Sequence, residues 1–189
     1  MPAIRPVELH PIIVHFPIAL LIFSVLLDFL GVIFRRWGLT TAATWLLLFG
    51  TPGAGFALLS GWVSEHYITV GATADALLSL HKTVAFLTTA LFSLLLFVRL
   101  VWLAPRGFAL FRQWAPLRPL VDIVDQALRL IAPKLYEPPL PAAAVALYLL
   151  LSVAAVGLLG LTGYLGGALV YDHGVGSPTG LVPMLLGAL

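Results

Sequence analysis

Long apolar stretches alternate with short polar connections along this chain, a pattern typical of membrane-spanning helices. A helix needs about 20 apolar residues to cross a hydrocarbon layer ~30 Å thick. Four stretches reach that length, and spans are expected at about 11–34, 41–63, 75–103 and 141–170. The expected fold class is therefore all-α: an integral membrane four-helix bundle, with residues 1–189 forming a single transmembrane domain.

The connection between the third and fourth spans, residues 104–140, is too long for a simple turn. Within it, Pro119 to Ala132 has the pattern of a short amphipathic helix with basic flanks. Its apolar face is expected to carry Leu120, Val124, Leu128 and Ile131. Such a helix suits the cytoplasmic surface of a membrane, and the alternative is a docking element for a partner subunit.

The composition supports this class and limits the chemistry. Hydrophobic residues make up 61% of the chain and charged residues 10%, which no water-soluble domain of this size resembles. There is no cysteine, which excludes disulfides, thiolate metal sites, cysteine-ligated iron–sulfur clusters and covalently attached c-type haem. Methionine occurs only as Met1 and Met184, so histidine is the leading candidate ligand for a metal or haem.

The basic residues predict the orientation of the spans. Eight of the ten Lys and Arg residues fall in the connection after span one, or at the end of span three and beyond it. The positive-inside rule assigns that side to the cytoplasm, so both termini are expected in the periplasm of a multi-pass inner membrane protein. The net charge of +2 thus reflects topology and does not indicate a nucleic-acid partner.

All the histidines fall on the opposite, outer side in this topology. Histidine is costly in hydrocarbon and is a common neutral metal ligand, so histidines at span ends indicate a site. They are His10 and His15 near the start of span one, His66 after span two, His81 near the start of span three, and His173 after span four.

Two of these histidines lie inside spans at similar depth. With helices starting at Pro11 and Asp75, a rise of 1.5 Å per residue puts His15 about 6 Å and His81 about 9 Å inside. The other three form a layer at the membrane surface. We therefore expect His15 and His81 to be the central ligand pair, with His10 and His173 as a possible second pair.

Small residues near these positions would leave room for a flat macrocycle. Ala19 and Ala85 lie one turn deeper than His15 and His81. In span four, glycine recurs every three residues, at Gly157, Gly160, Gly163 and Gly166. This strip fits close approach of a porphyrin, and it equally fits close helix packing.

Asp28 is the only acidic residue deep within a span. At 100° per residue it lies about 220° around the helix from His15, so the two side chains face different directions. An ion pair with Arg99 or Arg35 near the cytoplasmic surface is the expected arrangement.

At this point the sequence resembles a known family of bacterial four-span membrane proteins, the domain of unknown function 2231 family. The resemblance covers nearly the whole chain and is carried by motifs at both ends and between them. These are His10-Pro11-x-x-Val14-His15-Phe16-Pro17-Ile18, Asp28-Phe29-Leu30-Gly31, Gly61-Trp62, His81, and Gly163-Tyr164-Leu165-Gly166-Gly167-x-Leu169-Val170-Tyr171-x-His173-Gly174.

The resemblance implies that His10, His15, His81 and His173 are the histidines of the family, whereas His66 matches no motif position. Some members are fused to Rieske or cytochrome c modules, which implies an electron-transfer setting with a partner of that kind. The connection at 104–140 looks longer than is usual in the family.

Three functions follow from these observations. The first is a membrane redox protein that binds b-type haem near the periplasmic side, within or beside a respiratory or photosynthetic complex. The second is a zinc or copper site at the outer face, built from His10, His15, His81 and His173. The third is a structural subunit of a larger complex without its own cofactor. No nucleophile–base or nucleotide-binding motif occurs, so an electron-transfer or accessory subunit is favoured over a stand-alone enzyme.

The topology can be tested with a reporter fused after Leu189. Because the fourth span should return the chain to the outside, a reporter that works only in the periplasm should be active. Activity of a cytoplasmic reporter at the same position would contradict the placement of every histidine on the outer side.

Overall fold

The computed structural model describes residues 6–68, 70–111, 115–131, 133 and 141–175. The described residues form long helices joined by short connections. The helices are α1 (Pro6–Ile33), α2 (Trp37–Glu65), α3 (Ala72–Phe111), a short 3₁₀ turn η1 (Ala115–Leu117), α4 (Arg118–Ile131) and α5 (Ala142–Tyr171). Four of them, α1, α2, α3 and α5, are long and apolar enough to cross a membrane, so the prediction of an all-helical four-span protein is confirmed.

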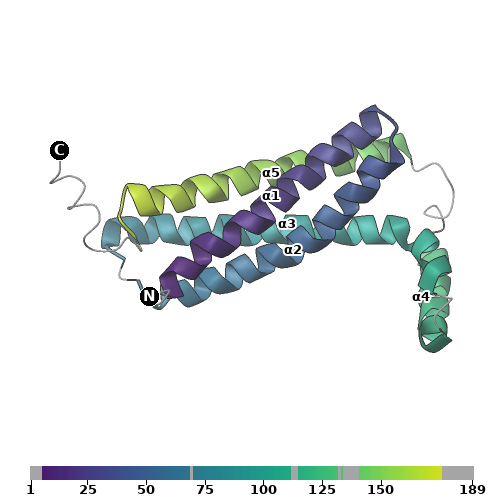
Figure 1. Ribbon diagram of the computed structural model, residues 1–189, viewed down its shortest axis with the longest axis horizontal. Helices are drawn as coiled ribbons and strands as arrows, with labels where there is room; N and C mark the ends of the chain where they lie inside the picture. Colours follow the sequence, from purple (N-terminus) through teal and green to yellow (C-terminus); the bar gives the residue numbers. More distant parts are fainter. Residues whose placement is uncertain (1–5, 69, 112–114, 132, 134–140, 176–189) are drawn as a thin grey trace.

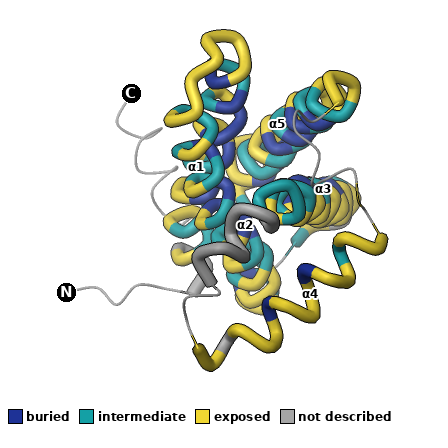
Figure 2. Tube along the Cα trace, turned by 90° about the vertical axis from the view of Figure 1, so that its right-hand side faces the viewer, coloured by how far each residue is buried: buried dark blue, intermediate teal, exposed yellow. Residues whose placement is uncertain are grey.

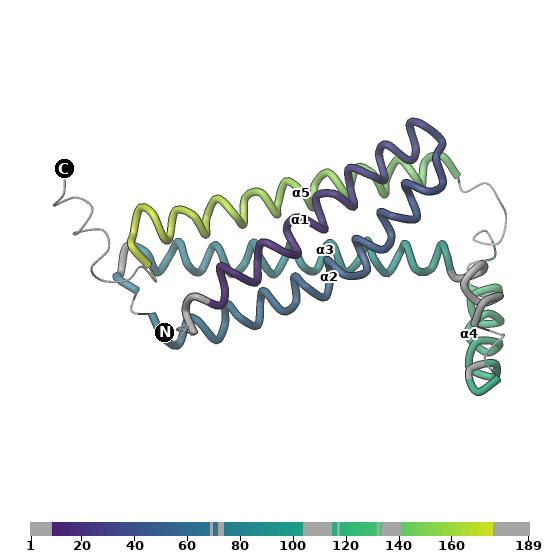
Figure 3. The backbone as a smooth tube through the Cα atoms, in the orientation of Figure 1, coloured from purple at the N-terminus to yellow at the C-terminus, as the bar shows by residue number. Residues whose placement is uncertain are grey.

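The four spans run along one common direction (Figures 1 and 3). The chain enters each span alternately from the two ends of the bundle, so α1 and α3 run one way and α2 and α5 the other. We call the end where α1 and α3 begin the histidine end. The opposite end, which holds the α1–α2 turn at Arg35 and the helix α4, is called the arginine end.

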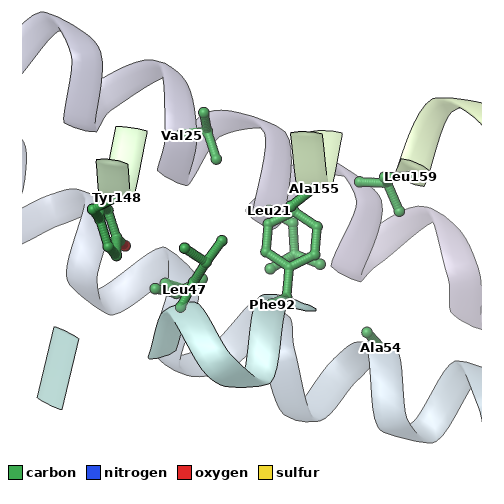
Figure 4. Close-up of a cluster of buried hydrophobic side chains, with 9 residues drawn as sticks. Leu21, Val25, Leu47, Ala54, Phe92, Tyr148, Ala155 and Leu159 are labelled. Atoms are coloured by element: carbon green, nitrogen blue, oxygen red, sulfur yellow. The ribbon is translucent and has the colours of Figure 1, made fainter. Parts of the chain in front are cut away.

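A narrow buried stripe on each span forms the core, and the remaining faces are exposed (Figure 2). The centre is packed by Leu21, Leu47, Phe92 and Ala155, each at most 2% exposed (Figure 4). Gly50 allows α1 and α2 to approach closely, since a Cβ there would lie 2.9 Å from Cδ2 of Leu21. Large apolar side chains cover the outward faces, as lipid contact requires.

One buried ion pair crosses the bundle toward the arginine end. Asp28 on α1 pairs with Nη2 of Arg99 on α3, and the same nitrogen lies 3.2 Å from the hydroxyl of Tyr148 on α5. The guanidinium of Arg99 also stacks on the Tyr148 ring at 4.8 Å from its centroid. The expected pairing of Asp28 with one of two arginines is thus found with Arg99, and it links three of the four spans.

The apolar spans Leu9–Ile33 and Ala74–Leu103 agree with the expected 11–34 and 75–103, but the helices that contain them are longer. α1 begins at Pro6 and not at Pro11, because a proline at the first helical position needs no N–H partner and the helix then continues through Pro11. α3 continues to Phe111, so the helix takes up the first eight residues of the connection expected at 104–140. Pro141 immediately precedes α5, close to the expected start of that span.

The helix α4 lies across the direction of the spans at the arginine end and packs against α3 (Figure 1). Val121 and Asp125 are its buried residues, and Asp125 accepts a hydrogen bond from Arg129. Three of the four residues expected on its apolar face, Leu120, Val124 and Ile131, are exposed. Ile123 and Leu130 are exposed beside them, so the apolar face is not covered by the described part of the chain.

This orientation predicts that the bilayer covers the apolar face of α4. The natural chain has no cysteine, so single cysteines report on single positions. Cysteine at Ile123, which is 66% exposed in the protein alone, should be at least several-fold slower to react with a water-soluble maleimide in membranes than cysteine at the neighbouring Asp122. Equal rates at the two positions in intact vesicles would contradict burial in the bilayer.

Candidate functional site

Two histidines from different spans come together at the histidine end. His10 on α1 and His81 on α3 are half-buried and lie close enough for their charges to interact. His10 precedes Asp28 by 18 residues, and His81 precedes Arg99 by 18 residues. Because 18 residues make about five complete helical turns, each histidine lies on the same face of its helix as the charged residue below it. Asp28 faces Arg99, so the same sides of α1 and α3 present the two histidines to each other.

The ring of His81 is oriented by a hydrogen bond to the backbone of α5. Its Nδ1 lies 3.1 Å from the carbonyl oxygen of Thr162. A carbonyl can only accept, so Nδ1 must carry the proton and donate it. In the neutral ring, Nε2 then has a free lone pair.

The ring of His10 is oriented in the same way by α2. Its Nδ1 lies 3.0 Å from the hydroxyl oxygen of Ser60, while that hydroxyl donates its only hydrogen to the carbonyl of Ala57 at 2.9 Å. Ser60 must therefore accept from His10, which assigns the proton of His10 to Nδ1 as well. The hydrogen bonds of His10 to Ser60 and of His81 to Thr162 both use Nδ1.

A glycine lies against each of these imidazole rings. A Cβ added at Gly61 would lie 3.1 Å from Cε1 of His10, and one added at Gly166 would lie 3.2 Å from Cε1 of His81. Both distances are tighter than ordinary carbon contacts, so only glycine leaves the rings where they are. Each ring thus has a hydrogen bond and a close backbone contact from the adjacent helix.

The other histidines are not part of this arrangement. His15 is exposed, and its Nδ1 donates to the carbonyl of Pro11 in its own helix. His66 is exposed, bonds to the Trp62 carbonyl at 2.9 Å and packs edge-on against the Trp62 ring. His173 is exposed beyond the end of α5. The structure therefore places His10, and not the expected His15, where its charge interacts with that of His81.

His10 and His15 differ because they point in different directions around the axis of α1. The five residue steps from His10 to His15 turn the helix by about 500°, so the two side chains point about 140° apart and only one can face the bundle interior. The position facing inward is the one in line with Asp28, which is His10.

The small residues expected to leave room for a macrocycle have different surroundings. Ala19 is exposed and Ala85 is half-buried. A Cβ at Gly157, Gly160 or Gly163 would meet nothing within 4 Å, so these glycines do not hold α5 against another described helix. Gly166 is the member of the strip that makes a close contact, and that contact is with His81.

The arrangement offers two nitrogen ligands and no larger cluster. Within the described residues, no three His, Asp or Glu side chains gather where they could hold one metal ion. Glu65, which lies near the histidine end, pairs with Lys82 at 2.7 Å. A tetrahedral zinc site from protein ligands needs three or four such groups, whereas a centre with two axial imidazoles needs two.

Sequence reasoning missed the residues that orient the rings: Ser60, Gly61 and the Thr162 carbonyl. It also missed Tyr148 as a partner of Arg99. The expected angle of about 220° between His15 and Asp28, combined with an inward-facing Asp28, already implied an outward-facing His15.

The chain belongs to the family described as "Predicted membrane protein (DUF2231)", whose model matches residues 6–116 and 120–179. This confirms the resemblance stated on the sequence motifs. No curated protein matches the chain, and no solved structure matches it.

The glycine contacts can be tested without knowledge of a ligand. Gly61→Ala and Gly166→Ala should each lower stability by about 1–3 kcal/mol, because the new methyl group displaces an imidazole ring. Thermal unfolding of the detergent-solubilised protein measures this. Gly160→Ala on the same helix as Gly166 is the matched control and should cause no loss, since its methyl group meets open space. Equal midpoints for all three variants would contradict the tight ring packing.

Proposed function

We propose that this member of the DUF2231 family is a membrane redox protein that binds b-type haem between His10 and His81 and transfers electrons. The observation that carries the proposal is that the two imidazole rings carry their proton on the same nitrogen, Nδ1. Each comes from a different span, donates Nδ1–H to the adjacent helix and leaves Nε2 free. A second-shell hydrogen bond that fixes the tautomer and direction of an imidazole is the usual companion of a metal-bound histidine.

The composition and the surroundings of the site support haem over a bare ion. In a chain without cysteine, histidine is the leading ligand for a haem iron, and His10 and His81 would hold it through their Nε2 atoms. A helical bundle with ligands on facing helices is a common setting for such a group. When bound, haem supplies a centre that gains and loses one electron.

The protein's own residues hold the two ligands ready. Ser60 and the Thr162 carbonyl keep the Nδ1 protons in place, so Nε2 of each neutral ring keeps a lone pair for a ligand. Gly61 and Gly166 let the rings approach the neighbouring backbones closely. His10 and His81 would hold the haem, and the bound group would supply one-electron redox chemistry, which fits electron transfer.

The histidine end is proposed to face the periplasm of a bacterial inner membrane. The basic residues at the arginine end support this orientation through the positive-inside rule. A cytochrome c-like or Rieske protein on the periplasmic side would then be the electron partner, as the fused family members suggest.

An absorption spectrum of the protein purified after expression with added haem precursor tests the proposal. The wild type should show a low-spin b-type spectrum that sharpens on reduction, and both His10→Ala and His81→Ala should abolish it because each removes one axial ligand. Ser60→Ala should weaken haem retention about 10–100-fold by freeing the His10 ring.

Two controls separate this pair from the alternatives. His66→Ala should keep the spectrum, since His66 bonds only to its own helix turn. His15→Ala should also keep it; loss in His15→Ala with retention in His10→Ala would favour the pair His15 and His81 instead. A wild type that binds stoichiometric copper or zinc and no haem would contradict the haem proposal, as would one that binds neither.

A further inference from the structure

The spans α1 and α3 carry equivalent residues at a constant separation of 71 positions. His10 and His81 are one such pair, and Asp28 and Arg99 are another. Between them lie Leu21 and Phe92, both 0% exposed, at the same separation. α1 and α3 also run in the same direction through the bundle (Figure 3).

The spans α2 and α5 are related in the same way, with a constant separation of 105 positions. Their buried residues fall in register: Ala43 with Tyr148, Leu47 with Ser152, Gly50 with Ala155, and Ala54 with Leu159. A match in burial alone is weak evidence for this relation, because a helix returns to the same face about every 3.6 residues. About one in four possible separations would therefore align the buried positions of two helices.

The contacts of the two histidines determine the separation between α2 and α5 to the exact residue. Gly61 touches His10 and Gly166 touches His81, and these glycines are 105 positions apart. His10 interacts with the backbone of Ala57 and His81 with that of Thr162, which are again 105 positions apart. On each helix the carbonyl precedes the glycine by four residues, so the two contacts mark one place on one helix face. A chance match in burial does not predict that a histidine ring lies at that place on both helices.

We infer that the four spans are two copies of one helical hairpin, related by a local two-fold axis along the bundle, with one binding site of two equivalent halves on that axis. Repeats whose corresponding helices run the same way are related by an axis along the membrane normal. The packing agrees with this relation, since α1 contacts α5 just as its equivalent α3 contacts α2.

The axis passes between His10 and His81. A ligand held there meets two imidazoles that each lie against an equivalent glycine, Gly61 or Gly166. The acceptors of their Nδ1 protons differ, since the Ser60 hydroxyl holds His10 and a backbone carbonyl holds His81. The equivalent of Ser60 is Leu165. Such a site suits a single centre that binds one imidazole on each of two opposite sides, such as the iron of a haem. A ligand whose two sides differ strongly would not match the symmetry of the site. The nature of the ligand rests on the proposed function, whereas the duplication does not.

The axis also passes between Asp28 and Arg99, where the two copies carry opposite charges. Two identical hairpins would place two carboxylates or two guanidiniums against each other, and like charges inside a membrane have no partner. Opposite charges at equivalent positions remove that conflict. Tyr148, which bonds to Arg99, has the small Ala43 as its equivalent, so the room for a phenol also differs between the copies.

Exchange of the two charges in the full-length chain tests the duplication. Asp28→Arg and Arg99→Asp alone each create a like-charged pair, and we expect both to lose most of the monodisperse protein. The combined exchange D28R/R99D should regain at least half of the wild-type yield and thermal midpoint, because the opposite charges then pair again at positions that differ mainly in the missing Tyr148 hydroxyl. Adding A43Y/Y148A should recover more by moving the phenol to the new arginine.

The outcome does not depend on a cofactor. If neither the double nor the four-fold exchange exceeds the single variants, the duplication is overturned, because the two positions then have unrelated surroundings. We expect the double exchange to recover yield and thermal midpoint, and the exchange of all four residues to recover more of both.

A second measurement addresses the equivalence of the two ligands. His10→Gly and His81→Gly should each regain the spectrum on addition of free imidazole, with half-saturating concentrations within about threefold of each other. Rescue of only one variant would overturn the equivalence. If the wild type has no haem spectrum, the proposed function fails, and the charge exchange still decides the duplication.

Discussion

The ion pair between Asp28 and Arg99 determines how α1 and α3 are turned toward each other. A charged side chain in hydrocarbon must meet an opposite charge, so the two helices have little freedom to rotate about their own axes. Tyr148 extends the constraint to α5. Because His10 and His81 lie five turns along the same faces, a contact near the arginine end sets the geometry at the histidine end, roughly 27 Å away by the rise of the helix.

The coarse features of the fold follow from sequence because they depend on single helices. The lengths of the apolar stretches give four spans, and Asp28 is so isolated in its span that its partner had to be one of a few arginines. The gathering of the histidines at one end follows from the alternation of the spans alone.

The finer features depend on how helices face each other, which a pattern along one helix does not contain. The start of α1 was placed one turn late, at Pro11, because that proline suits a first turn as well as Pro6 does. That error moved His10 outside the helix and favoured His15. The role of Gly166 was open for a similar reason, since all four glycines of the α5 strip look alike until a neighbour such as His81 is known.

The five-turn spacing has a consequence for how this part of the protein can change during evolution. Apolar residues between His10 and Asp28 can replace one another as long as the buried stripe keeps its volume. Insertion or deletion of one residue is different, because it rotates His10 by about 100° relative to Asp28 and turns the imidazole out of the bundle. The number of residues between the two positions is therefore more strictly constrained than their identity.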